Sequence, residues 1–96
     1  MEIEKLLQSK REEILHLATR HGAYNVRVFG SAARGEAGPQ SDVDLLVAME
    51  PGRSLLDLGS LLADLRDLMG CQVDVVTEES IYWLLRRRIL REARPL

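Results

Sequence analysis

Two aspartates, Asp42 and Asp44, stand one residue apart at the start of an apolar run. We expect residues 42–47 to form a β-strand, and because side chains alternate across a strand, both carboxylates would point to the same face. Unpaired carboxylates this close repel each other, and a divalent cation between them removes that repulsion. Hard oxygen ligands favour Mg²⁺ or Mn²⁺. The pair is therefore a candidate metal site.

A turn signal, Gly30-Ser31, precedes the aspartates. It lies between Val26–Phe29, expected as a short strand, and Ala32-Ala33-Arg34, which can start a helix. Backbone amides at a strand-to-helix turn bind anions, and glycine lets a phosphate approach the main chain without a side-chain clash. The hydroxyl of Ser31 adds a further polar group. After this helix, residues 38–41 are expected to form a loop that leads to the aspartates.

A third acid, Asp74, interrupts the apolar run 72–76, which is expected as another strand. An unpaired charge inside such a strand is costly to bury. We therefore expect Asp74 to lie beside Asp42 and Asp44 and to complete a site of three carboxylates. The alternative, a surface acid on an edge strand, stays open because the third carboxylate has no fixed spacing.

The spacing of these groups resembles a known signature. Gly30-Ser31, ten intervening residues and then Asp42-Val43-Asp44 are similar to the motif of the DNA polymerase β-like nucleotidyltransferase superfamily. The longer string GSAARGEAGPQSDVDLLV resembles its smallest branch, the minimal nucleotidyltransferases that accompany HEPN-domain toxins as antitoxins. A solvated acidic strand next to an ordinary turn is the structural alternative.

The resemblance implies a small mixed β-sheet with flanking helices, the nucleotidyltransferase fold. It implies that Asp42 and Asp44 hold two Mg²⁺ ions, with Mn²⁺ as a substitute, and that ATP binds at Gly30-Ser31. Asp74 would help bind the metal near the attacking hydroxyl and can act as its base. Arg34 would neutralise phosphate charge, although a solvated arginine after the turn fits equally well.

The acceptor that the resemblance implies is a tyrosine of a HEPN ribonuclease toxin, which receives AMP from ATP. Two alternatives remain open. The first is nucleotidyl transfer to a small molecule of the aminoglycoside type, which the missing substrate domain disfavours. The second is an antitoxin that inhibits by binding alone, with a vestigial site, which the intact Gly30-Ser31 turn and aspartate pair disfavour.

Composition sets the remaining limits. At 96 residues, we expect a single domain over 1–96, and the one cysteine, Cys71, permits no internal disulfide. Nothing resembles a signal peptide or a membrane span, so a cytoplasmic location is expected. Residues 1–77 hold 8 basic and 12 acidic side chains, and residues 78–96 hold 5 and 3. This balance argues against direct nucleic-acid binding.

Helical patterns surround the expected strands. Residues 2–21 have apolar positions at helical spacing and end at Gly22, whose neighbour His21 suits the last turn. His16 and His21 lack any partnering motif and stay outside the site. A second helix should begin at a capping box and end at Gly70, with the box formed by Ser54 and Asp57. Its apolar stripe is expected in the core, with a homo-oligomer interface as the alternative; the stripe consists of Leu55, Leu58, Leu62, Leu65 and Met69.

The last helix is expected to begin at Thr77 as N-cap, with Glu78 and Glu79 in its first turn. Its apolar face consists of Ile81, Leu84, Leu85 and Ile89. Five arginines occupy the rest of this segment: Arg86, Arg87, Arg88, Arg91 and Arg94. They form either a solvated face or a partner-docking surface with Tyr82 and Trp83 as aromatic anchors.

Overall fold

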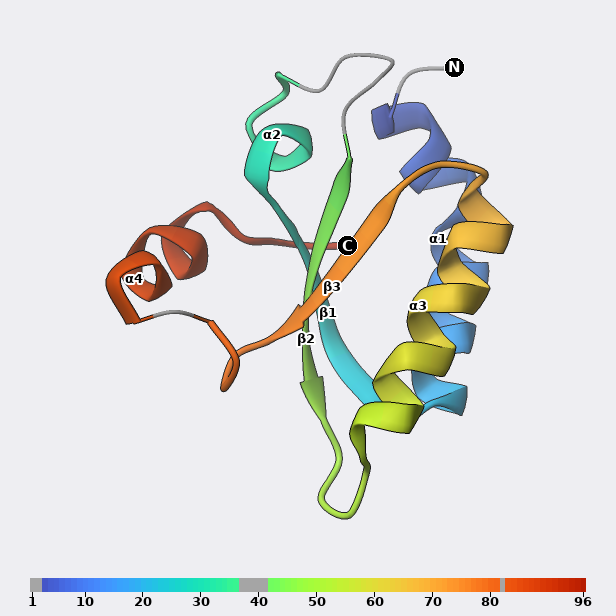
Figure 1. The fold of residues 1–96 in the computed structure, drawn as a ribbon. Coiled ribbons are helices and arrows are strands. Elements are labelled where there is room, and N and C mark those ends of the chain that lie inside the picture. Colours follow the sequence, from blue (N-terminus) through green and yellow to red (C-terminus); the bar gives the residue numbers. More distant parts are fainter. Residues whose placement is uncertain (1–2, 37–41, 82) are drawn as a thin grey trace.

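The fold was described from a computed structural model covering residues 3–36, 42–81 and 83–96 (Figure 1). The expected loop at 38–41 and the aromatic residue Tyr82 lie outside these described residues. The elements follow one another in this order: α1 (Ile3–Arg20), β1 (Ala23–Phe29), α2 (Gly30–Ala33), β2 (Val43–Met49), α3 (Leu55–Met69), β3 (Val73–Thr77), α4 (Trp83–Glu92) and β4 (Arg94–Pro95).

The strands form one mixed sheet in the order β3-β2-β1-β4. β1 is antiparallel to both β2 and β4, whereas β2 and β3 are parallel. A parallel pair needs a crossover connection, and α3 supplies it. The small mixed sheet with flanking helices is therefore confirmed.

Helices α1 and α3 lie side by side against one face of the sheet, and α4 lies on the other side (Figure 1). Side chains of β2 alternate as expected: Val43, Leu45 and Val47 are buried in the core under the two helices. Asp44 belongs to the opposite face. The alternation of apolar and polar positions thus sends the acidic side chains away from the core. Within the described part of the chain, no helix is long and apolar enough to cross a membrane.

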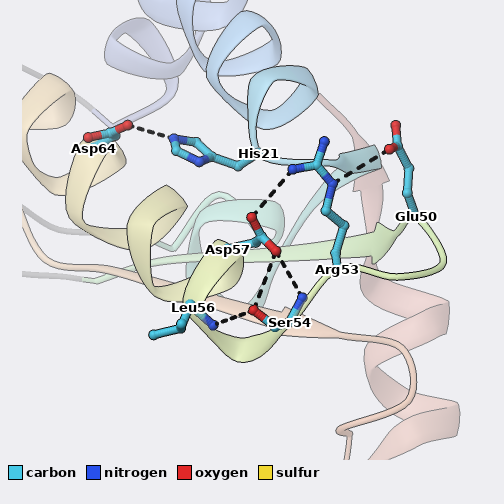
Figure 2. A network of polar contacts seen from close by, with 7 residues as sticks. All are labelled: His21, Glu50, Arg53, Ser54, Leu56, Asp57 and Asp64. Carbon is cyan, nitrogen blue, oxygen red and sulfur yellow. Dashed lines mark hydrogen bonds and ion pairs between the residues drawn. The ribbon is translucent and has the colours of Figure 1, made fainter.

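Helix α1 confirms the first expected helix and its end. Gly22 follows it with φ +80°, a left-handed conformation that favours glycine. His21 forms a contact between helices, because its Nε2 lies 2.7 Å from Oδ2 of Asp64 on α3 (Figure 2). His21 therefore joins the end of α1 to α3, next to the end of β2 that is opposite to Asp44.

Helix α3 begins with the expected capping box. The Ser54 hydroxyl accepts from the Leu56 amide, and Asp57 Oδ2 accepts from the Ser54 amide at 2.9 Å (Figure 2). The helix ends at Gly70, which has the left-handed φ of +67°. Both boundaries were predictable because local backbone groups determine them.

The expected leucine stripe of α3 is only partly in the core. The buried residues of the helix are Leu61, Leu65 and Met69, of which Leu65 and Met69 belong to the stripe, whereas Leu55 is 84% exposed. Including Leu55 in the core was therefore wrong. Leu55 belongs to the first turn, directly after the exposed Ser54, and the core reaches α3 only from Leu58 onward.

The expected start of the last helix is also wrong. Thr77 is the last residue of β3, pairs with Val47, and exchanges hydrogen bonds with Ser80 in a tight turn. Glu78 forms an ion pair of 2.8 Å with Arg27 of β1 and so does not cap a helix. Helix α4 begins only at Trp83. The sheet and this turn outweigh the capping preference of Thr77.

Helix α4 has no buried residue, so its expected apolar face does not pack in the core. Leu84 and Leu85 are both exposed. The chain then forms β4, which had no strand-like pattern and pairs with β1 through Arg94 and Pro95. β1 itself begins three residues earlier than expected, with an irregularity near Asn25, whose φ is +51°.

Candidate functional site

The turn at Gly30-Ser31 lies directly against the aspartate strand. β1 ends at Phe29, which pairs with Asp44 across the sheet, and α2 begins at Gly30 with φ +72°. A Cβ placed on Gly30 would lie 2.5 Å from Oδ2 of Asp44, well inside van der Waals contact. Glycine is required here for both its backbone conformation and its lack of a side chain. The two halves of the motif therefore meet in space.

Asp44 and Asp74 are register partners in the parallel pair of β2 and β3. Neighbouring strands lie about 4.8 Å apart, so the two carboxylates leave adjacent backbone positions on the same face of the sheet. Asp74 is 57% exposed, and its Oδ1 lies 3.7 Å from Nη2 of Arg66 on α3. Asp74 therefore lies beside Asp44, as expected, and it is also an exposed acid on the edge strand β3, as in the alternative.

Asp42 stands just before β2 rather than on it. The first paired residue is Val43, which faces Val73 and donates its amide to the Gln72 carbonyl at 3.0 Å. The expectation that Asp42 belongs to the strand was therefore wrong by one residue. Its side chain is exposed and remains close enough to act on the charge of Asp44.

Asp44 is the electrostatic centre of the cluster. Burial raises its pKa above the usual value, and the negative charges of Asp74 and Asp42 raise it further. The positive charge of Arg34 acts in the opposite direction. Asp74 and Asp42 thus both repel the charge of Asp44, and Arg34 offsets this repulsion only in part.

The donor chemistry of this cluster fits a divalent cation, since carboxylate oxygens whose repulsion is only partly relieved are hard ligands. Asp42, Asp44 and Asp74 are the residues that would hold it. Among the residues described, however, no three His, Cys, Asp or Glu side chains lie close enough together to hold one metal ion, so the expected site of three carboxylates is not formed in this structure. Asp74 instead faces the guanidinium of Arg66.

Arg34 directly follows α2 and is held by two carboxylates. Its Nε donates to Glu36 at 3.0 Å, and its Nη1 donates to both oxygens of Glu92 on α4 at 3.1 Å. Arg34 is thus an exposed arginine, as in the alternative, but one that is paired with two carboxylates. The pair with Glu92 could not be predicted from the sequence, because Glu92 is 58 positions away and carries no local signal.

Residues 3–96 match the family model described as Nucleotidyltransferase domain. The chain belongs to this nucleotidyltransferase family. It is 43% identical over 83 residues to a provisionally named protein adenylyltransferase, MJ0435, of Methanocaldococcus jannaschii, covering 86% of this chain and 89% of the relative. It is 41% identical over 91 residues to protein adenylyltransferase MntA of Thermococcus cleftensis, covering 95% and 89%.

Solved structures agree with this placement of the nucleotidyltransferase. One provisionally assigned as a minimal nucleotidyltransferase is 53% identical, with a TM-score of 0.89, and the match covers 100% of this chain and 97% of the other. A toxin–antitoxin crystal structure with AMP-PNP shares the fold at 20% identity and a TM-score of 0.75, over 88% and 69%. The resemblance read from the Gly-Ser and Asp-Val-Asp spacing is thereby confirmed.

Proposed function

We propose that this nucleotidyltransferase transfers AMP from ATP to a hydroxyl group of a partner protein. The observation that supports this best is the meeting of three features at one end of β2. The Gly30 turn lies against Asp44, Asp44 stands in register with Asp74, and the acidic cluster carries repulsion that a cation would remove. A phosphate-binding turn next to clustered carboxylates suits phosphoryl chemistry.

Each group has a role in the proposed reaction. The turn at Gly30-Ser31 binds the triphosphate, and Asp42 and Asp44 supply the carboxylate oxygens for two Mg²⁺ ions. When bound, these ions neutralise phosphate charge and lower the pKa of the acceptor hydroxyl. The acceptor oxygen forms a bond to the α-phosphorus, the bond to the bridging oxygen breaks, and pyrophosphate leaves. A carboxylate oxygen of Asp74 takes the proton of the hydroxyl.

The position of Asp74 suits this role. Its side chain is more exposed than that of Asp44, which the Gly30 turn partly covers. An acceptor that approaches from solvent therefore meets Asp74 at the edge strand β3, while the nucleotide is held on the β1 and β2 side. In this proposal the two substrates bind on opposite sides of Asp44.

The acceptor in this proposal is a tyrosine of a HEPN ribonuclease toxin, which AMP would silence. Relatives at 43% and 41% identity bear the name protein adenylyltransferase, and a toxin–antitoxin complex shares the fold. The exposed leucines of α4, a helix without buried residues, also suit a protein partner. A protein acceptor therefore accounts for both the site and the open surface beside it.

Mass spectrometry of the partner tests this function. The chain is incubated with its cognate partner, Mg²⁺ and ATP, and the intact mass of each protein is measured. The proposal predicts a partner heavier by one or more AMP groups, located on tyrosine by peptide fragmentation. A partner of unchanged mass, together with AMP attached to a small-molecule acceptor in the same mixture, would contradict it.

A further inference from the structure

Glu92 ends helix α4 and binds the arginine beside the nucleotide turn. Its two oxygens accept from Nη1 of Arg34, each at 3.1 Å, and Oε1 also accepts from Nε of Arg88 at 3.2 Å. The carboxylate is only 19% exposed. Burial raises the pKa of Glu92, but bonds and charges from the two arginines outweigh this and lower it overall. Glu92 is therefore a fixed anion, not a mobile surface acid.

Arg34 connects this anion to the nucleotide turn. It follows the last residue of α2, four positions beyond Gly30, and its Nε is held by Glu36. Its amide donates to the Gly30 carbonyl at 3.2 Å, so Arg34 is fixed to the turn where the triphosphate would bind. The Arg34 side chain is 35% exposed and remains accessible there.

The backbone that carries Glu92 is tied to the same turn. Directly after α4, Arg94 and Pro95 of β4 pair with Val28 and Arg27 of β1. The Leu96 amide also donates to the Val26 carbonyl at 3.1 Å. β1 leads straight into Gly30, so Glu92 and the turn are fixed to one strand.

We propose that Glu92 is a positioning residue for nucleotide binding: it holds the Arg34 guanidinium, from α4, where the phosphates of ATP bind. A flexible arginine would lose rotamer freedom on binding, and a carboxylate that fixes it beforehand removes part of that loss. This inference rests on the proposed function. It adds that the affinity for ATP depends on the position of α4, because α4 carries Glu92.

The opposite effect is that Glu92 competes with the phosphates for Arg34. One observation favours positioning. The Glu92 carboxylate is only 19% exposed and also pairs with Arg88 at 3.2 Å, so a second guanidinium offsets part of its charge toward ATP.

A double-mutant cycle on ATP affinity tests the inference. Isothermal titration calorimetry with the whole chain, with Mg²⁺ and again in chelator, gives the Kd of ATP for wild type, Glu92→Gln, Arg34→Gln and the double variant. We expect Glu92→Gln to weaken binding about three- to tenfold. Because Glu92 acts through Arg34, the double variant should bind no more weakly than Arg34→Gln alone. With partner present, Glu92→Gln should raise the KM for ATP and leave kcat within about twofold.

Two further variants keep the outcome clear. Glu50→Gln is the matched control, since Glu50 pairs with Arg53 at 3.7 Å at the far end of β2, and its ATP Kd should equal that of wild type (Figure 2). Glu92→Asp keeps the charge and should recover part of the affinity, which separates positioning from a loosened helix.

Tighter ATP binding by Glu92→Gln, or additive losses in the cycle, would overturn the inference. If Arg34→Gln weakens binding while Glu92→Gln does not, the inference fails and the proposed function stands; if Asp44→Asn leaves transfer intact, the proposed function itself fails.

Discussion

The Cα of Gly30 faces Oδ2 of Asp44 so closely that a Cβ on Gly30 would lie 2.5 Å from that oxygen. Glycine and aspartate are thus two parts of one small structure, although 14 positions separate them. The turn that would bind phosphate also forms one wall around the carboxylate that would hold a cation. A side chain at position 30 would therefore disturb both the phosphate-binding turn and the Asp44 carboxylate.

Gly30→Ala should therefore destabilise the protein and stop AMP transfer. An alanine in the left-handed region costs about 1–2 kcal/mol, and the added methyl would also displace the Asp44 carboxylate. Gly52→Ala is the matched control, because Gly52 has φ +88° but nothing within 4 Å of its added Cβ. Urea unfolding and transfer assays on both variants check this. Equal losses of transfer in the two variants would show that backbone strain alone is responsible.

Much of the site was predictable because its residues are recognised by their types and by their short spacing along the chain. Gly30-Ser31 and the aspartate pair flank one connection. Asp74 was assigned to the site because a charge is costly to bury in an apolar strand, although Asp74 is exposed on the edge strand β3. The register of Asp44 with Asp74 then follows from the parallel pairing of β2 and β3. Sequence reasoning placed Asp42 on the strand, whereas sheet pairing begins only at Val43.

Asp44→Asn should stabilise the metal-free protein at neutral pH. The folded state raises the pKa of Asp44 through burial and through repulsion from Asp74 and Asp42, so ionised Asp44 opposes folding. After allowance for solvent screening, we expect about 0.5–1 kcal/mol, and less for the exposed Asp42→Asn. Chemical denaturation in chelator measures both. A less stable Asp44→Asn variant would mean that this carboxylate makes net favourable contacts.

The same carboxylate predicts a pH dependence with a definite sign. Between the ordinary value of 3.8 and its raised pKa, Asp44 binds more protons folded than unfolded, so its contribution to stability falls as pH rises. Relative to Asp44→Asn, wild type should lose stability as pH increases from about 3.8, until the raised pKa is passed. Melting curves of both proteins across this range give the difference. A wild type that gains stability relative to Asp44→Asn over this interval would reverse the sign and contradict the account.

Magnesium with ATP should stabilise wild type and leave Asp44→Asn nearly unchanged. A ligand that binds only the folded state at tenfold excess over its Kd adds about 1.4 kcal/mol. For a domain of this size that raises the melting temperature by roughly 5–10 °C. Thermal melts in chelator and in magnesium-ATP provide the comparison. The same shift in both proteins would show that the nucleotide binds without the aspartate cluster.

The capping box offers a test of stability that is separate from chemistry. Ser54→Ala removes the acceptor for the Leu56 amide and should cost about 1 kcal/mol. Because α3 begins at the far end of β2 from Asp44, AMP transfer at a permissive temperature should stay within about twofold of wild type. Ser60→Ala, an exposed position within the same helix, is the control and should change stability little.

What sequence could not predict depends on contacts between distant segments. The hydroxyls of Thr77 and Ser80 form their own turn, so α4 starts at Trp83 and not after Thr77. β4 is a strand only because β1 has a free edge for Arg94 and Pro95 to pair with. The pair of Arg34 with Glu92 likewise joins positions that no local pattern connects.

The most direct test of the central claim is the transfer of label from [α-³²P]ATP to protein. The chain, its cognate partner and Mg²⁺ are mixed, and labelled protein is counted for wild type, Asp42→Asn, Asp44→Asn and the exposed control Asp67→Asn on α3. The account predicts labelled partner with wild type and with Asp67→Asn, and at least a hundredfold less with either site variant, since an amide cannot supply the ligand charge that the metals need. Undiminished labelling by Asp42→Asn and Asp44→Asn would show that these carboxylates do not form the catalytic site.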